Sequence, residues 1–165
     1  MEGFELKLRI SPPDSKFRKL IGHNTYNRLH LEELKKNRFV CGGCSYRPLD
    51  ENRAIASLKL HVIEINKEKP EESPCIVLCI ACHSTQHIDV SIEKGWVQLV
   101  NSNYSQRQLI DMCRLNSIHT HAKEDNLRHL KIPPLDFLLS MKDGTLSENT
   151  KSKVLFTNKF DWGDL

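Results

Sequence analysis

The stretch Leu78-Cys79-Ile80-Ala81-Cys82-His83-Ser84-Thr85-Gln86-His87 gathers many of the metal-binding side chains of this chain. It contains the pair Cys79-x-x-Cys82, and residues 45–78 separate this pair from an earlier one, Cys41-x-x-Cys44. Zinc favours four thiolates in a tetrahedron, and each Cys-x-x-Cys turn can supply two of them. The sequence therefore predicts a structural zinc ion, with the ligands Cys41, Cys44, Cys79 and Cys82.

Three histidines accompany the cysteines. His83 and His87 are four residues apart, which would place them on one face of a helix. His61 lies in an apolar, alternating segment and could reach them from a strand. A lone histidine is more often structural than a ligand, but this set stands beside a four-cysteine site. The pattern therefore predicts a second divalent ion, held by His61, His83 and His87.

The remaining cysteines have less obvious roles. Cys75 follows Pro74 and is either a substitute zinc ligand or a small buried residue. Cys113 lies on the apolar face of a predicted helix and is expected in the core.

Composition indicates an ordinary globular chain. It has 165 residues, of which 39% are hydrophobic and 27% charged. There is no run of about 18 apolar residues that would span a membrane. The first residues, MEGFELKLRI, lack the apolar core of a secretory signal. We therefore expect an intracellular protein, cytoplasmic or nucleoid-associated, in which reduced thiols favour metal binding over disulfides.

Periodicity and turn residues predict an α+β fold. Alternating apolar residues predict strands at residues 4–10, 56–65 and 153–160. Apolar stripes between capping and breaking residues predict helices at residues 24–39, 83–96, 105–118 and 133–144. Asn24 or Thr25 is expected to cap the first helix, and Ser105 with Gln108 to form a capping box on the third. We expect three parts: a basic strand and helix over residues 1–40, a zinc-binding unit over 41–95 and a helical extension over 96–165.

The segments CGGC, LHVIEIN and LCIACHSTQH together resemble the HNH nucleases, which have the ββα-metal fold. Zinc-knuckle members of that family carry a Cys-x-x-Cys pair, a strand with the pattern L-H-H-I-D-x-N, and then L-C-x-x-C-H-x-x-x-H. The resemblance covers residues 41–87 and implies a treble-clef-like ββα-metal core with structural zinc. It implies that the three histidines hold a catalytic ion: Mg²⁺, Mn²⁺, Ni²⁺ or Zn²⁺. It also implies that Asn66 braces the loop and positions His61.

One position departs from the family pattern. The second histidine of L-H-H-I is the general base of the family, and Val62 stands in its place. Valine has no lone pair, so it cannot take a proton from water. Glu64, or a histidine further along such as His119 or His121, could substitute for the missing base.

The N-terminal third of the chain is basic, and this charge indicates which partners the protein could bind. From Lys7 to Arg47 the chain carries ten lysines and arginines, and only Asp14, Glu32 and Glu33 oppose them. Such a segment is compatible with duplex DNA and, by the resemblance, would lie near it. A solvated helix face is the plainer explanation of the same bias. The end of the chain, FDWGDL, is either a docking peptide for a protein partner or a segment packed on the core.

Three functions remain open at the level of sequence. The first is an HNH-type phosphodiesterase that nicks or cleaves nucleic acid weakly. The second is an inactive HNH-derived zinc module that binds DNA or a protein partner. The third is a treble-clef-like zinc module whose histidines are incidental.

Overall fold

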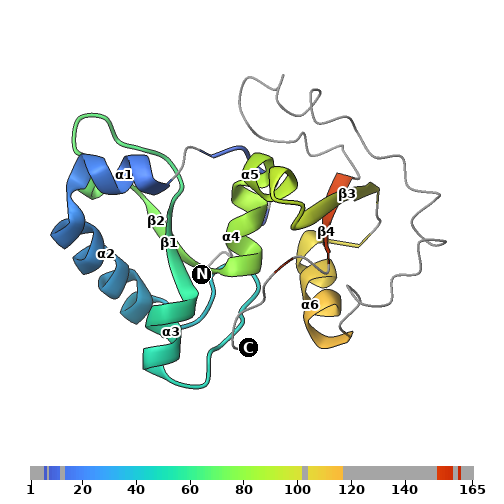
Figure 1. Cartoon of the computed structure of the whole chain (residues 1–165). Helices are drawn as coiled ribbons and strands as arrows, with labels where there is room; N and C mark the ends of the chain where they lie inside the picture. The colour runs from blue at the N-terminus through green and yellow to red at the C-terminus, as the bar shows by residue number, and fades with distance from the viewer. Residues whose placement is uncertain are drawn as a thin grey trace. The chain divides into compact units, whose positions relative to one another are not determined.

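The computed structural model describes residues 6, 8–11, 14–101, 104–116, 152–157 and 160. The chain divides into two compact units, one built from residues 12–83 and the other from residues 5–11 and 84–164. Each unit combines helices with a small antiparallel sheet, so the predicted α+β class is confirmed (Figure 1). The division falls after His83, whereas the sequence suggested boundaries near residues 40 and 95.

Two helices open the first unit. α1 spans Asp14–Ile21 and α2 spans His23–Lys36, and Figure 1 shows them joined by a sharp bend. α2 confirms the predicted helix, but the expected cap is wrong. Gly22 is the N-cap, with a φ of 81° and no side-chain hydrogen bond, because only a residue tolerant of left-handed φ can turn the chain so tightly between two helices.

A β-hairpin follows the helices. α3, Glu51–Ser57, leads directly into β1, Leu58–Val62, which pairs antiparallel with β2, Cys75–Cys79. The predicted strand is therefore shorter than expected, because the Asp50 side chain accepts the backbone N–H of Arg53 and starts a helix in front of it. The loop between the strands contains the short 3-10 helix η1, Pro70–Glu72.

The two faces of this hairpin differ. Val62 is paired with Cys75, and His61 with Ile76. Residues directly opposite in an antiparallel pair point to the same side, and successive residues alternate. Val62 therefore shares a face with Leu58 and Leu60, while His61 points to the other face. Both are buried, Val62 at 5% exposure and His61 at 0%.

The helix predicted over residues 83–96 is two helices. α4 spans Ile80–Gln86, α5 spans Ile88–Glu93, and His87 is the N-cap of α5. Within the second unit, the carbonyls of Thr85 and Gln86 accept hydrogen bonds from the backbone of Arg9 and Ser11. These carbonyls would otherwise bond the next turn of a continuous helix, so the break has a clear cause.

The prediction of a strand over residues 4–10 is largely wrong for the residues of this range that the structure describes, 6 and 8–10. Ile10 forms only an isolated bridge with His87. Its partner is the turn between two helices, which cannot extend a ladder.

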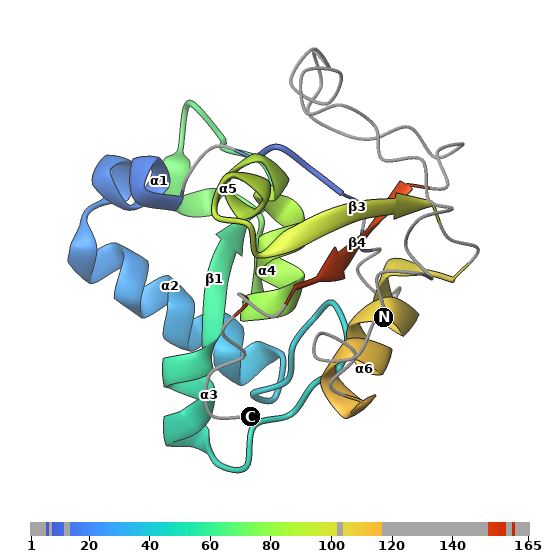
Figure 2. The same cartoon turned by 45° about the vertical axis from the view of Figure 1, so that its right-hand side comes forward.

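The second unit contains a second hairpin-like pair. β3, Val97–Asn101, pairs antiparallel with β4, Ser152–Phe156, and α6, Gln106–Asn116, packs against β4 (Figure 2). The predictions of α6 and β4 are confirmed, whereas β3 was not predicted. Ser105 and Gln108 make the reciprocal bonds of the predicted capping box. The helix predicted over residues 133–144 lies outside the described residues.

Aromatic packing closes this unit. The ring of Phe160 lies 4.4 Å from that of Phe156 and 6.0 Å from that of Trp96, between centroids. Phe160 is 4% exposed. At this residue the structure agrees with the second of the two interpretations of FDWGDL, a segment packed on the core. Cys113 is fully buried, which confirms its predicted place in the core.

Candidate metal centres

Four cysteines meet in the first unit. Cys41 and Cys44 come from the turn after α2, Cys79 ends β2, and Cys82 lies on α4. All four are buried, and their sulfur atoms lie within 4.8 Å of one another. The sulfurs of Cys44 and Cys79 are 3.7 Å apart. A tetrahedron with Zn–S bonds of about 2.3 Å has edges of about 3.8 Å, so the Cys44–Cys79 pair matches one edge of a zinc site.

The backbone holds this cluster in shape. The N–H of Cys79 donates to the sulfur of Cys41 at 3.2 Å, and the N–H of Gly42 donates to the carbonyl of Val77 at 2.9 Å. A Cβ at position 42 would overlap the side chain of Ile76. Glycine at this position thus allows the first cysteine turn to lie directly against β2.

Electrostatics also favours a cation among the four sulfurs. The neighbouring Cys41 and then Cys44 raise the pKa of the Cys79 thiol well above its usual range, and the same neighbours raise the pKa of Cys82. Hydrogen bonding from these neighbours is the first cause in each case, and thiolate charges this close also oppose one another. A metal cation would supply the positive charge that allows coordinating thiols to ionise. These four cysteines could therefore hold a metal ion such as zinc.

A second group of metal-binding side chains lies in the same unit. Atoms of Asp14, His61 and His83 approach within 4.8 Å of one another. Oδ2 of Asp14 lies 2.5 Å from Nε2 of His83, and its Oδ1 lies 3.6 Å from Nδ1 of His61. The two imidazole rings stand nearly perpendicular, with an interplanar angle of 87° and centroids 5.5 Å apart. One carboxylate and two imidazoles form a donor set suited to divalent transition metals.

This second group is partly exposed. The His61 side chain is fully buried, whereas those of Asp14 and His83 are 18% and 21% exposed. A solvent molecule or substrate could therefore approach from the Asp14 and His83 side.

Asp14 is the site residue that sequence reasoning missed. It is the first residue of α1, where an acidic side chain is ordinary because it complements the helix dipole. Nothing in its local sequence separates it from such a role, so only the folded chain reveals its position beside two histidines.

His87 belongs to the second unit. Its Nδ1 lies 3.2 Å from the carbonyl oxygen of Ser11. Because α4 ends at Gln86, the expectation that His83 and His87 lie on one continuous helix is wrong. The ligand role of His87 stays a prediction.

The remaining candidates flank the hairpin. The side-chain oxygen of Asn66 accepts the backbone N–H groups of Glu68 and Lys69, and the backbone N–H of Asn66 donates to the Ser73 hydroxyl. Asn66 therefore braces the loop between β1 and β2. Glu64 is exposed just beyond β1.

Cys75 is separate from the four-cysteine cluster. Its thiol donates to the Ser73 carbonyl at 3.3 Å. Burial, and then the charges of Glu33 and Asp14, raise its pKa to about 11, so a protonated thiol is the stable form at neutral pH.

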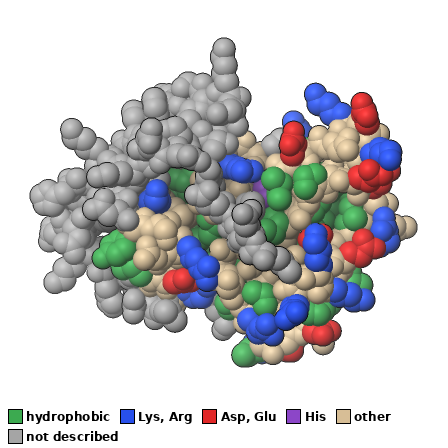
Figure 3. Space-filling view, turned by 180° about the vertical axis from the view of Figure 1, so that it is seen from behind, with side chains coloured by type: hydrophobic (Ala, Val, Ile, Leu, Met, Phe, Trp, Pro, Cys, Tyr) green, Lys and Arg blue, Asp and Glu red, His purple; other side chains and the backbone are tan. Residues whose placement is uncertain are grey.

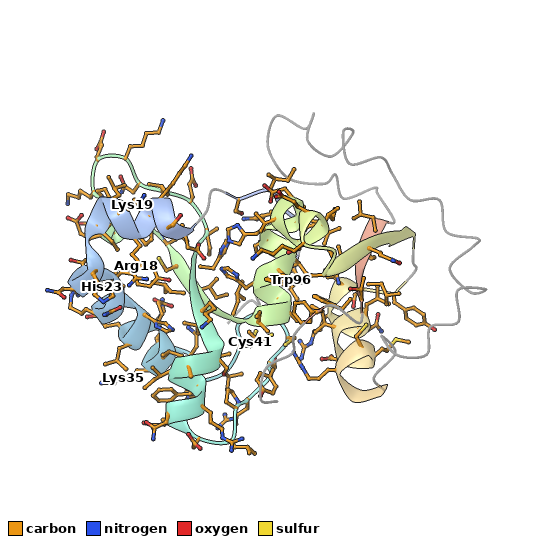
Figure 4. The ribbon with its side chains drawn as sticks, viewed as in Figure 1. Arg18, Lys19, His23, Lys35, Cys41 and Trp96 are labelled. Carbon is orange, nitrogen blue, oxygen red and sulfur yellow. The ribbon has the colours of Figure 1, made fainter. Side chains whose placement is uncertain are left out.

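Basic side chains of α1 and α2 are partly neutralised. Arg28 pairs with Glu32 and Lys36 pairs with Glu33, each at 2.8 Å. Arg18 donates to His23 and lies over the ring of Tyr26, and Figure 4 shows Arg18 and His23 together where the two helices meet. Figure 3 shows blue and red side chains interleaved on one face rather than a purely basic surface. Lys16, Lys19 and Lys35 are exposed.

Comparison with models of known protein families and with curated proteins finds no match for this chain. Among the described helices, none has both the length and the apolar character that crossing a membrane requires.

Proposed function

We propose that this chain is an HNH-type, metal-dependent phosphodiesterase that acts weakly on nucleic acid. In this proposal β1, β2 and the start of α4 form the ββα-metal unit. The four cysteines hold a structural zinc ion, and the histidines hold a second, catalytic ion.

The approach of His61 and His83 to one another carries the proposal. These histidines come from a buried strand and from the helix after the hairpin, and a carboxylate lies against both of them. A fully buried histidine that only filled the core would not require a second histidine and an acid beside it. The four-cysteine cluster lies where the same hairpin meets its helix, and it would hold both elements in register.

The side chains suggest a division of roles. A divalent ion bound by His61 and His83 would supply positive charge to a scissile phosphate and its leaving oxygen. The partly exposed side of the site would admit the phosphate. Asn66 would fix the loop that follows β1, and through it the end of the strand that carries His61.

Weak activity follows from Val62. Its face of β1 is apolar, and Val62 itself is almost fully buried. The general-base position therefore holds no proton acceptor, a loss that typically reduces a rate by ~100- to 10,000-fold. Glu64 is exposed and is the substitute base within the described residues, while His119 and His121 lie outside them.

Duplex DNA is the proposed substrate. The exposed lysines of α1 and α2 would contact the phosphate backbone. The charge bias of the N-terminal third supports this choice, although two of its residues are paired with glutamates.

An inactive HNH-derived zinc module that binds DNA or a protein partner is the second candidate. The apolar, buried position of Val62 favours it, because a site selected for cleavage would retain a base. Both candidates use the same fold and the same zinc site.

Nicking of supercoiled plasmid distinguishes the two. We expect slow nicking by the zinc-loaded chain with added Mg²⁺, Mn²⁺, Ni²⁺ or Zn²⁺, and loss of nicking in His83→Ala. His23→Ala is the matched control, because His23 is an exposed histidine of α2 outside the site. Plasmid binding without nicking under all four ions would favour the inactive module.

A further inference from the structure

We propose that Asp14 is a direct ligand of the ion at His61 and His83. The inference rests on the proposed second ion and adds a ligand that the sequence pattern does not contain. The resulting set of two imidazoles and one carboxylate would accept harder ions, Mn²⁺ in particular, better than a site of histidines alone.

The position of the carboxylate supports a direct role. One oxygen of Asp14 faces Nε2 of His83 at 2.5 Å and the other faces Nδ1 of His61 at 3.6 Å. A carboxylate that only oriented a ligand would sit behind one imidazole, on the side away from the ion. Asp14 instead reaches a nitrogen of each ring, and those rings are nearly perpendicular. It therefore occupies the space in which the two histidines converge.

Packing fixes Asp14 in this place before any ion binds. Three residues after it, Phe17 is 1% exposed and meets the ring of Tyr26 with centroids 6.5 Å apart. The Tyr26 hydroxyl donates to the carbonyl of Leu60, the neighbour of His61 in β1. The helix that carries Asp14 is thus tied to the strand that carries His61 by contacts that do not involve the site. A preorganised ligand loses little conformational entropy on binding.

The chemistry of the donors predicts ion preference. Imidazole suits Zn²⁺ and Ni²⁺, whereas carboxylate oxygen suits Mg²⁺ and Mn²⁺. A carboxylate also brings a negative charge, which partly neutralises a divalent ion in a partly buried site. Removing Asp14 should therefore weaken Mn²⁺ binding more than Zn²⁺ binding.

The test measures binding of the metals alone. The full chain, with its four-cysteine site filled by zinc, is titrated with Mn²⁺ and with further Zn²⁺ by calorimetry, and free Mn²⁺ is followed by electron paramagnetic resonance. Asp14→Asn and Asp14→Ala are compared with Glu68→Gln, which removes an exposed negative charge from the same unit. A thermal melt of each variant shows that it is folded.

A ligand role predicts that both Asp14 variants lose Mn²⁺ affinity by more than ~100-fold, the upper end of losses from an outer-sphere partner. Zn²⁺ affinity should fall less, and Glu68→Gln should bind as the wild type. Wild-type affinity in Asp14→Asn, with a loss only in Asp14→Ala, would overturn the ligand role, because an amide oxygen can still orient His83. Equal losses for both ions would overturn the predicted preference for Mn²⁺.

The outcome separates this inference from the proposed function. If the wild type binds the second ion through Asp14 but never nicks DNA, the inference stands and the phosphodiesterase does not. If the wild type nicks DNA and Asp14→Asn binds Mn²⁺ normally, the reverse holds. A chain that binds no second ion at all overturns both.

Discussion

Oδ2 of Asp14 lies 2.5 Å from Nε2 of His83, although 69 positions separate the two residues in the chain. This pair joins the start of α1 to α4, within the second candidate metal centre. The four cysteines connect the turn after α2 to β2 and α4 in a similar way. Cysteine, histidine and aspartate side chains therefore link segments of the first unit that are distant in sequence, and the following predictions concern those links and the surfaces beside them.

Removing zinc should unfold the first unit. Structural zinc contributes on the order of 10 kcal/mol to the folding of small modules, and the four sulfurs here tie two turns to a two-stranded hairpin. Chelation, or Cys79→Ala, should abolish the cooperative melt seen by circular dichroism. Cys75→Ser is the control, since Cys75 lies outside the cluster, and it should keep a full complement of zinc. A melt that survives complete zinc removal would contradict the prediction.

Cys75 should react slowly with iodoacetamide at neutral pH despite its partial exposure. Its pKa is raised to about 11 by burial and by the charges of Glu33 and Asp14, and only the thiolate is nucleophilic. The rate of alkylation, measured by mass spectrometry on the zinc-loaded chain, should rise with pH up to about 11. Asp14→Asn should lower that pKa and speed the reaction at pH 8. A rate that levels off near pH 9 would show an ordinary thiol.

Binding of duplex DNA should depend on salt through the exposed lysines. Each duplex phosphate contacted contributes about −0.9 to the slope of log affinity against log salt. Lys19→Gln should reduce the magnitude of this slope by about one and weaken binding to all sequences alike. Arg28→Gln is the matched control, because Arg28 is paired with Glu32 and should matter less. Binding that is absent at low salt, or insensitive to salt, would reject a contact with the backbone.

Val62→His should raise nicking while lowering stability. Alternation along β1 puts position 62 on the face opposite His61, so the new imidazole would leave His61 in place. Val62 is nearly buried, and the larger side chain should destabilise the fold by about 1–3 kcal/mol. Nicking is measured well below the melting temperature of the variant. Val62→Leu, which adds bulk without a base, should not raise it.

A folded, metal-loaded Val62→His chain that still does not nick would favour the inactive zinc module. Strong nicking by the wild type, abolished by Glu64→Gln, would instead identify Glu64 as the base in use.

Local signals in the sequence determined several features of this chain. The meeting of the four cysteines was predictable because each pair lies within one turn, so only two turns had to come together. The capping box of Ser105 and Gln108 was predictable because both of its hydrogen bonds form within four residues. The strand that contains His61 was predictable from its alternation, although α3 shortens it.

Long-range contacts decided the rest. β3 was missed because its alternating stretch is only five residues long, which is too short to identify a strand before its distant partner β4 is known. The predicted helix over residues 83–96 breaks at His87. The backbone N–H groups of Arg9 and Ser11 donate to the carbonyls of residues 85 and 86, which would otherwise have continued the helix. Asp14 is the clearest case. Its carboxylate and its place at the start of a helix can be read from the sequence. Only the packing of Phe17 on Tyr26, and the hydrogen bond of Tyr26 to β1, bring that carboxylate to the histidines.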